Sequence, residues 1–242
     1  MLKPHEDAYG QMMLDYLRDG SGYEVVEHSD GHFGIGAGPS LYFTGYDAWR
    51  QVERDALALV KSRVLDVGCG AGRFMLWLQE NGHDVFGIDI SPGAIEACRR
   101  RGLANVEVLS IDQVSRRLGT FDTVLLLGGN LALLGPADRA KRNLLRLHRV
   151  TSPDGRVLGA NRDWTKSGDP ETRAKALDNM ARGRFSGEHR SRIRYKKFAT
   201  PFSTSSRMSP DELRALVEGT GWFVTEILDR SEGIYIAVLD KT

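Results

Sequence analysis

From residue 63 onward, short apolar runs alternate with amphipathic stretches. The apolar runs lie at 63–68, 84–90, 106–111, 121–128 and 156–163, and the stretches at 72–82, 91–102 and 137–151 have helical periodicity. The run FDTVLLLG is apolar almost throughout, as is typical of a strand buried on both faces. This alternation predicts an α/β fold built on a doubly wound, mostly parallel sheet.

The end of the chain breaks the alternation. A helix is expected over 209–221, followed by strands at 222–228 and 234–240. The connection between these two strands is too short for a crossover, so they must pair antiparallel. The sequence therefore predicts an open parallel sheet that is closed by one antiparallel hairpin.

The first strand runs into a glycine-rich loop, VLDVGCGAGRF, at 64–74. Gly68, Gly70 and Gly72 follow one another at a spacing of two, which allows a sharp turn and a close approach of a ligand to the backbone. The helix that begins near Gly72 points its free N–H groups into the loop. Dinucleotide-binding folds also carry glycines at this place, so the loop alone leaves two cofactor classes open.

Three acidic residues follow the ends of neighbouring strands, where open α/β sheets bind ligands. Asp66 precedes the loop, where a carboxylate opposes a pyrophosphate and suits a cation such as S-adenosylmethionine. Asp89 ends the second strand, where it can accept both hydroxyls of a ribose. Asp112 ends the third strand, within reach of an adenine amino group, although a helix cap or turn explains it equally well.

Four segments together resemble the successive motifs of the class I S-adenosylmethionine-dependent methyltransferases, over about residues 60–163. They are VLDVGCGAGRF, VFGIDISPGAIEACRRRG, VLSID and FDTVLLLG. The closing hairpin resembles the reversed last strand of that family. The resemblance implies a Rossmann-like sheet of seven strands in the order 3-2-1-4-5-7-6, with strand 7 antiparallel. It also implies S-adenosylmethionine as cofactor and S-adenosylhomocysteine as product.

The resemblance assigns cofactor contacts residue by residue. Asp66 and the backbone of the loop would hold the methionine part, and Asp89 would hold the ribose. Ile90 would pack on the adenine, and Ile111 or Asp112 would contact the adenine edge. The full set of expected cofactor residues is Asp66, Gly68, Gly70, Gly72, Asp89, Ile90, Ile111 and Asp112.

The length of 242 residues fits a single domain, which is expected to comprise four segments. Residues 1–60 form an N-terminal helical and aromatic lid, and residues 61–163 the cofactor-binding core. Residues 164–208 form an insertion on the substrate side, and residues 209–242 the closing helix and hairpin. Within the lid, helices are expected over 5–19 and, with Asp47 as N-cap, over 47–60, with a hairpin between them.

Methyl transfer is a direct displacement in which positioning supplies much of the rate, so no strong catalytic signature is required. The candidates for a catalytic role are Asp163, Asn130, His5 and Tyr9. His5 and Tyr9 are four residues apart and would share one helix face. Candidate substrate contacts are Tyr42, Tyr46, Trp164, Arg192 and Arg194. Core packing for the aromatic residues and loop positions for Asn130 and Asp163 are the competing interpretations.

Seven basic residues lie between Arg182 and Lys197. In SRIRYKKF, Arg192, Arg194 and Lys196 recur with a period of two, which predicts a strand with one basic face. Such a face can line a pocket for an acidic substrate, or it can be a solvated strand face. A third interpretation is an RNA or protein methyltransferase that docks its substrate through this segment, although nucleic-acid binding usually needs a broader basic surface.

The net charge of +1 gives no global reason to expect nucleic acid or a membrane as partner, and no segment is as long and apolar as a membrane span. The two cysteines, Cys69 and Cys98, favour reduced thiols in a cytoplasm, and no cluster has metal-ligand spacing. We therefore expect a cytoplasmic enzyme without metal that methylates a small molecule, with a homodimer left open. Besides the RNA or protein methyltransferase, an NAD-dependent oxidoreductase and a non-catalytic cofactor-binding protein are the competing hypotheses.

Overall fold

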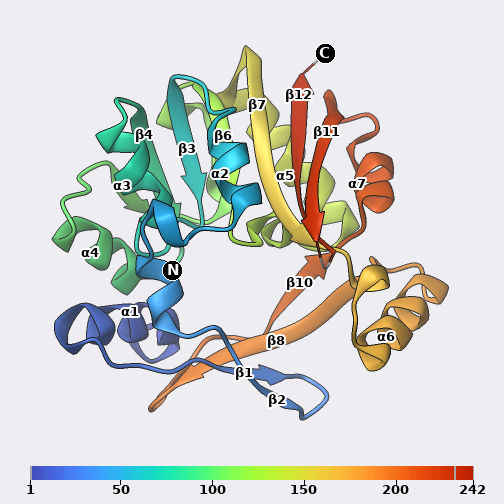
Figure 1. Ribbon diagram of the computed structural model, residues 1–242, viewed down its shortest axis with the longest axis horizontal. Coiled ribbons are helices and arrows are strands. Elements are labelled where there is room, and N and C mark those ends of the chain that lie inside the picture. The colour runs from blue at the N-terminus through green and yellow to red at the C-terminus, as the bar shows by residue number, and fades with distance from the viewer. Residues whose placement is uncertain (1, 232, 242) are drawn as a thin grey trace. The chain divides into compact units, whose positions relative to one another are not determined.

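The computed structural model describes residues 2–231 and 233–241 (Figure 1). A seven-stranded sheet has the order β11-β12-β7-β6-β3-β4-β5, in which β4 and β5 pair in parallel, as do β6 and β7. Strand β12 runs antiparallel to both of its neighbours. The predicted fold class and strand order are therefore confirmed. The strands are β3 (Arg63–Val67), β4 (Asp84–Asp89), β5 (Val106–Val108), β6 (Phe121–Leu126), β7 (Thr151–Arg162), β11 (Trp222–Ser231) and β12 (Ile234–Lys241).

A second sheet has the order β10-β8-β1-β2, and β9 pairs with β8. Its first hairpin, β1 with β2, lies in the glycine-rich part of the N-terminal segment. Strand β8 takes up most of the basic segment, as the alternation predicted. β1 pairs antiparallel with β8, so that Glu27 lies opposite Arg192. The strands are β1 (Val25–His28), β2 (Phe33–Ile35), β8 (Gly187–Tyr195), β9 (Phe198–Ala199) and β10 (Ser203–Arg207).

Several helices begin at residues that cap them. The Ser91 hydroxyl accepts a hydrogen bond from the Ala94 N–H at 3.0 Å, and Ser209 forms a capping box with Glu212. Among the described residues, no helix is long and apolar enough to cross a membrane. The α-helices are α1 (Ala8–Asp19), α2 (Gln51–Leu57), α3 (Arg73–Glu80), α4 (Pro92–Arg100), α5 (Ala137–Val150), α6 (Pro170–Ala181) and α7 (Pro210–Val217).

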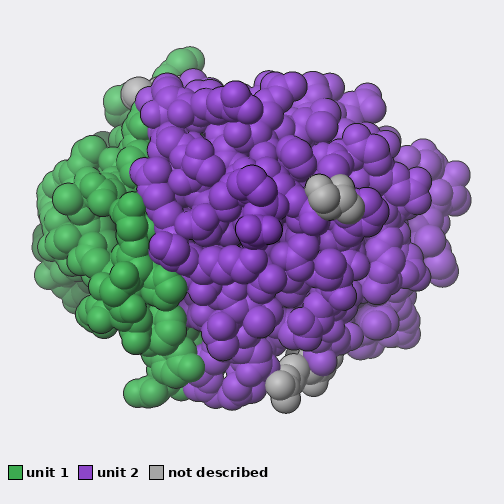
Figure 2. All heavy atoms as spheres, turned by 90° about the horizontal axis from the view of Figure 1, so that it is seen from above, with its two compact units in different colours: residues 1–49, 66–110, 190–203 green, residues 50–65, 111–189, 204–242 purple. Residues whose placement is uncertain are grey.

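The chain forms two compact units, coloured separately in Figure 2. Unit 1 comprises residues 1–49, 66–110 and 190–203, and unit 2 comprises residues 50–65, 111–189 and 204–242. The expected lid and the expected insertion each contribute residues to both units. The division of one domain into four segments along the chain stays a prediction.

Each unit has its own buried apolar residues. In unit 1, Met12 of α1 packs with Ile193 and Tyr195 of β8, while Met13 on the next helix position packs with alanines of α4 and of the glycine loop. In unit 2, the amphipathic helix α5 is buried along one side, and the Trp222 indole N–H donates to the Leu144 carbonyl at 2.9 Å.

The structure corrects the expected lid helices. Helix α1 begins at Ala8 rather than at residue 5, because the Asp7 side chain accepts the Gly10 N–H at 3.1 Å and ends a short 3-10 turn over Pro4–Glu6. His5 lies in that turn, so His5 and Tyr9 do not share a helix face. The helix expected over 47–60 is shorter: α2 begins at Gln51, and Asp47 lies in a preceding 3-10 turn instead of capping it.

Two further boundaries differ. Strand β7 starts at Thr151 and takes in the SPDG segment between the helix expected over 137–151 and the strand expected over 156–163, since Thr151 already pairs with Phe121 of β6. Near the end of the basic segment, strand β8 stops at Tyr195, and the next residue, Lys196, has a φ of 51°. The expected alternation therefore ends at Tyr195.

Candidate functional site

The glycine loop joins β3 to α3 within unit 1. Gly68, Gly70 and Gly72 have φ values of 75°, 56° and 75°, a region that residues with a Cβ adopt only at a cost. Space is also restricted, since a Cβ on Gly72 would lie 2.2 Å from Cδ1 of Leu103. The Gly68 N–H donates to the Ile88 carbonyl at 2.8 Å, which fixes the loop against the end of β4.

Asp66 is the buried acid of this loop, and the residue is only 2 % exposed. Its Oδ2 has no hydrogen-bond partner among the described residues. Burial and the negative charge of Asp89 raise the pKa of Asp66 to about 7, against the effect of the Arg73 cation. A buried carboxylate oxygen without a donor is costly, and a cationic ligand at this place would remove that cost.

Asp89 ends β4 and holds the glycine loop from the other side. Its Oδ2 accepts the Gly70 N–H at 3.0 Å, and its Oδ1 accepts the Ser91 N–H at 2.9 Å. Burial raises the pKa of Asp89, and these backbone donors act in the opposite direction. Each carboxylate oxygen has a second lone pair, so Asp89 can still accept hydroxyl groups. The neighbouring Ile90 side chain is 50 % exposed, which leaves an apolar face beside this carboxylate.

Two tyrosines of the N-terminal segment lie next to the same loop. A Cβ on Gly70 would lie 3.4 Å from Cδ1 of Tyr42, and the Tyr9 and Tyr42 rings meet edge to face with centroids 6.0 Å apart. The Tyr9 hydroxyl donates to Glu24 Oε1 at 3.4 Å. Burial and the negative charges of Glu24 and Asp89 raise the pKa of Tyr9, so this phenol stays protonated. Nothing in the sequence pattern pointed to Glu24, because its partners lie on other elements.

Asp7 connects the start of α1 to α4. Its Oδ1 accepts the Ser91 hydroxyl, and its Oδ2 accepts the Gly93 N–H at 2.8 Å. Gly10 and Gly93 allow α1 and α4 to come into backbone contact, since a Cβ on Gly93 would lie 2.6 Å from the Cα of Gly10. An aspartate directly before an amphipathic helix is a recognisable N-cap signal, so the capping role of Asp7 was available in the sequence.

The expected contacts of the adenine edge belong to unit 2. Ile111 is buried, at 5 % exposure, in a 3-10 turn over Ile111–Gln113. Asp112 in the same turn accepts two hydrogen bonds from Arg139, at 3.0 Å and 2.6 Å. The guanidinium of Arg139, a residue of α5, therefore binds both oxygens of this carboxylate.

The remaining catalytic candidates in unit 2 have local structural roles. Asn130 begins a 3-10 turn over Asn130–Leu134 that follows β6. Asp163 is 2 % exposed and caps the turn that contains Trp164, since its Oδ1 accepts both the N–H and the hydroxyl of Thr165. The Trp164 ring stacks on His189 with centroids 5.0 Å apart.

Tyr46 packs against α3 within unit 1. Its ring stacks on Trp77 with centroids 4.9 Å apart, and it also meets Trp49, whose indole N–H donates to the Thr44 carbonyl. These contacts support the interpretation of Tyr46 as a packing residue.

Most of the basic segment is paired with acids. Arg192 and Arg194 both donate to Glu27, and Lys196 donates to Asp15 at 2.7 Å. Arg182 pairs with Asp178, and Arg184 lies 4.0 Å from Glu188. The pairing with Glu27 supports the interpretation of β8 as a strand face over that of a pocket for an acidic substrate. Among residues 2–231 and 233–241, no group of His, Cys, Asp or Glu side chains has the arrangement of a metal site.

Residues 64–155 match the protein family described as "Methyltransferase domain". A solved structure of an S-adenosylmethionine-dependent methyltransferase from Bacteroides fragilis, in complex with S-adenosyl-L-homocysteine, has the same fold. The TM-score is 0.85 at 23 % identity, and the alignment covers 100 % of this chain and 98 % of the other. The family match over 64–155 supports the resemblance to class I S-adenosylmethionine-dependent methyltransferases, and the structural match shows the fold.

Two curated relatives match parts of the chain. A malonyl-[acyl-carrier protein] O-methyltransferase of Serratia marcescens is 31 % identical over 122 residues, which are 47 % of this chain and 46 % of the relative. A 2-heptyl-1-hydroxyquinolin-4(1H)-one methyltransferase of Mycobacteroides abscessus is 38 % identical over 72 residues, 27 % of this chain and 32 % of the relative. The chain thus spans about half the length of the first and about a third of the second.

Proposed function

Since residues 64–155 match a methyltransferase domain and the chain has the fold of an S-adenosylmethionine-dependent methyltransferase, we propose that it transfers a methyl group from S-adenosylmethionine to a small molecule. The observation that carries the proposal is the buried Asp66 carboxylate, whose Oδ2 lacks a hydrogen-bond donor among the described residues. This carboxylate would hold the cationic methionine part, together with the backbone of Gly68 and Gly70. When bound, S-adenosylmethionine supplies an electrophilic methyl group on a positively charged sulfur.

The charge around the loop supports this cofactor over NAD. Asp66 and Asp89 flank the glycines, and the buried Glu24 lies with Tyr9 and Tyr42 on the lid side. Carboxylates so close together favour a cation and oppose a pyrophosphate. The hypothesis of an NAD-dependent oxidoreductase is therefore disfavoured.

The other cofactor contacts follow from what each side chain offers. Asp89 would accept the ribose hydroxyls with its remaining lone pairs, and the exposed Ile90 side chain would pack on the adenine. Ile111 and Asp112 stay candidates for the adenine edge. Both carboxylate oxygens of Asp112 already accept a hydrogen bond from Arg139, so fewer lone pairs remain for the adenine.

For the acceptor we propose a small molecule that is bound beside Tyr9 and Tyr42, since these half-buried phenols lie next to the loop. The curated quinolone methyltransferase has a small aromatic acceptor by its name, which is consistent with this choice. The ion pairs of the basic segment argue against RNA or protein docking through 182–197.

The two free cysteines, Cys69 and Cys98, are consistent with the cytoplasm as the location, and a homodimer stays open.

The direct test is methyl transfer. Purified protein is incubated with S-adenosylmethionine carrying a labelled methyl group and with a metabolite extract, and the labelled products are separated by size and identified by mass. We expect label in compounds of low molecular mass. Label confined to RNA or protein would overturn the small-molecule acceptor, and a chain that does not bind S-adenosylhomocysteine in calorimetry would overturn the cofactor assignment.

Replacing Asp89 by alanine tests the ribose contact. We expect S-adenosylhomocysteine to bind about 2 kcal/mol more weakly, roughly a thirtyfold loss, because charge-assisted hydrogen bonds are removed. Calorimetric titration measures the change, and Asp84→Asn at the other end of β4 serves as the matched control that keeps wild-type affinity. An unchanged affinity in Asp89→Ala would mean that other residues hold the ribose.

A further inference from the structure

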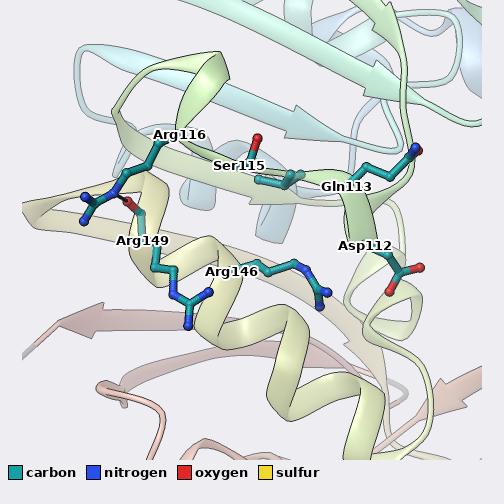
Figure 3. A pocket seen from close by; sticks show the side chains of 7 residues that line it. Asp112, Gln113, Ser115, Arg116, Arg146 and Arg149 are labelled. Atoms are coloured by element: carbon teal, nitrogen blue, oxygen red, sulfur yellow. Dashed lines mark hydrogen bonds between the residues drawn. The ribbon is translucent and has the colours of Figure 1, made fainter.

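Unit 2 has a cleft between α5 and the segment that follows β5, with a volume of about 320 Å³ (Figure 3). Arg146 and Arg149 reach it from successive turns of α5, and Arg116 reaches it from a 3-10 turn over Arg116–Leu118. The other residues that line it are Asp112, Gln113, Val114 and Ser115.

The three arginines of the cleft differ from those of the basic segment in their partners. Arg116 donates to the Arg149 carbonyl at 3.3 Å, and Arg146 donates to the Asn143 side-chain oxygen at 3.3 Å. Both acceptors are neutral. Among the described residues, no carboxylate forms an ion pair with Arg116, Arg146 or Arg149, whereas five of the seven basic residues in 182–197 pair with one.

Asp112, the acidic residue that lines the cleft, does not neutralise the charge of the three arginines. Asp112 accepts two strong hydrogen bonds from Arg139, which lies nearer the start of α5 than the arginines of the cleft. A further cation lies close by, since burial and the positive charge of Arg116 lower the pKa of Lys241. Like charges held together repel one another, and a bound anion would remove that repulsion.

From this excess of positive charge we infer that the cleft binds a small molecule carrying a diphosphate or a comparable multivalent phosphate group. Guanidinium groups bind phosphate oxygens in pairs of hydrogen bonds, and groups from two elements can hold the two phosphoryl ends. The volume of the cleft suits a ligand of small-molecule size, which distinguishes it from the extended basic surface that a nucleic acid requires. Of the residues that line the cleft, Asp112 is also a candidate cofactor contact, and the substitutions proposed below leave it in place.

Inorganic pyrophosphate is the probe for this inference. We expect calorimetric titration at low ionic strength to show one site on the wild-type chain, and the double variant Arg146→Gln, Arg149→Gln to bind about tenfold or more weakly. Arg142→Gln is the matched control, because Arg142 is an exposed arginine on the same helix that does not line the cleft. This control should keep wild-type affinity.

Three results would overturn the inference: no binding of pyrophosphate, equal binding by the wild type and the double variant, or equal weakening by Arg142→Gln. Single-stranded RNA that binds more tightly with each increase in length would assign the surface to nucleic acid instead. S-adenosylhomocysteine affinity is measured on the same proteins and should not change in the double variant. A lack of that affinity in the wild type would count against the proposed function and leave the anion site standing.

Discussion

Replacing Asp66 by asparagine is expected to weaken S-adenosylhomocysteine binding by about 3 kcal/mol, a loss of more than a hundredfold, because it removes one partner of a buried charge pair. The ligand retains the ammonium group of its amino-acid part, for which the carboxylate of Asp66 is the partner we propose. The Oδ2 atom is buried and lacks a donor among the described residues, so the ammonium would be its hydrogen-bond partner. Calorimetric titration of the wild type and the variant measures the difference, and Asp84→Asn again serves as the control.

The pH dependence of S-adenosylhomocysteine affinity tests the role of Asp66 in a second way. Burial and the charge of Asp89 raise the pKa of Asp66 from 3.8 to about 7. A cationic ligand needs the ionised carboxylate, so the affinity of the wild type should increase as the pH rises from about 6 to about 8 and then level off. Asp66→Asn should bind weakly at every pH in that range. A wild-type affinity that is independent of pH, or an equal slope in the variant, would show that Asp66 does not face the ligand.

The stability of the ligand-free protein should change in the opposite direction. Since the pKa of Asp66 is higher in the folded state than in the unfolded chain, the folded state binds the extra proton between pH 3.8 and about 7. The contribution of this group to the free energy of unfolding is therefore complete below pH 3.8 and is lost as the pH rises through about 7. The loss amounts to about 4 kcal/mol at most. Urea denaturation at several pH values should show a smaller decrease in Asp66→Asn than in the wild type.

Replacing Gly93 by alanine is expected to destabilise the packing of α1 on α4 by about 3 kcal/mol. The added Cβ would lie 2.6 Å from the Cα and 2.7 Å from the carbonyl carbon of Gly10. These are backbone atoms, so no side-chain rotation relieves the contact, and the helices must separate. Separation would also break the hydrogen bond from the Gly93 N–H to Asp7.

Two measurements check this prediction. Urea denaturation should show the lower stability of Gly93→Ala, and hydrogen exchange should show faster exchange of the α1 amides. Gly45→Ala is the matched control, because a Cβ there meets no atom within 4 Å and the φ of −84° is ordinary. Unchanged exchange in α1 would mean that the lid helix does not depend on this close approach.

The parallel sheet and the glycine loop were predictable because their signals are local. An apolar run such as FDTVLLLG indicates a buried strand by itself, and glycines at 68, 70 and 72 indicate a sharp turn that the structure confirms with positive φ values. The strand order came from the resemblance of the motifs, since alternation alone does not specify it. The start of α1 was placed wrongly because helical periodicity continued through His5, although Asp7 carried a capping signal.

The interpretation of single polar residues depended on partners that are distant in the sequence. Arg192 and Arg194 allowed either a substrate pocket or a solvated strand face, and their shared partner Glu27 lies 165 positions from Arg192. Asp112 faces Arg139, and the aromatic ring of Tyr46 stacks on Trp77. No periodicity within one element reveals such contacts.

The sequence by itself determined the α/β class, the glycine loop and the acids at the ends of β3 and β4, because strand burial, backbone turns and helix caps depend on residues close together in the chain. Only the tertiary structure decided which charges are neutralised. Because β1 pairs with β8, Glu27 forms ion pairs with arginines of the basic segment. By contrast, Arg116, Arg146 and Arg149 line a cleft and have no acidic ion-pair partner among the described residues. The physical reason is that an ionic interaction depends on distance in space and on burial, neither of which the spacing of residues along the chain specifies.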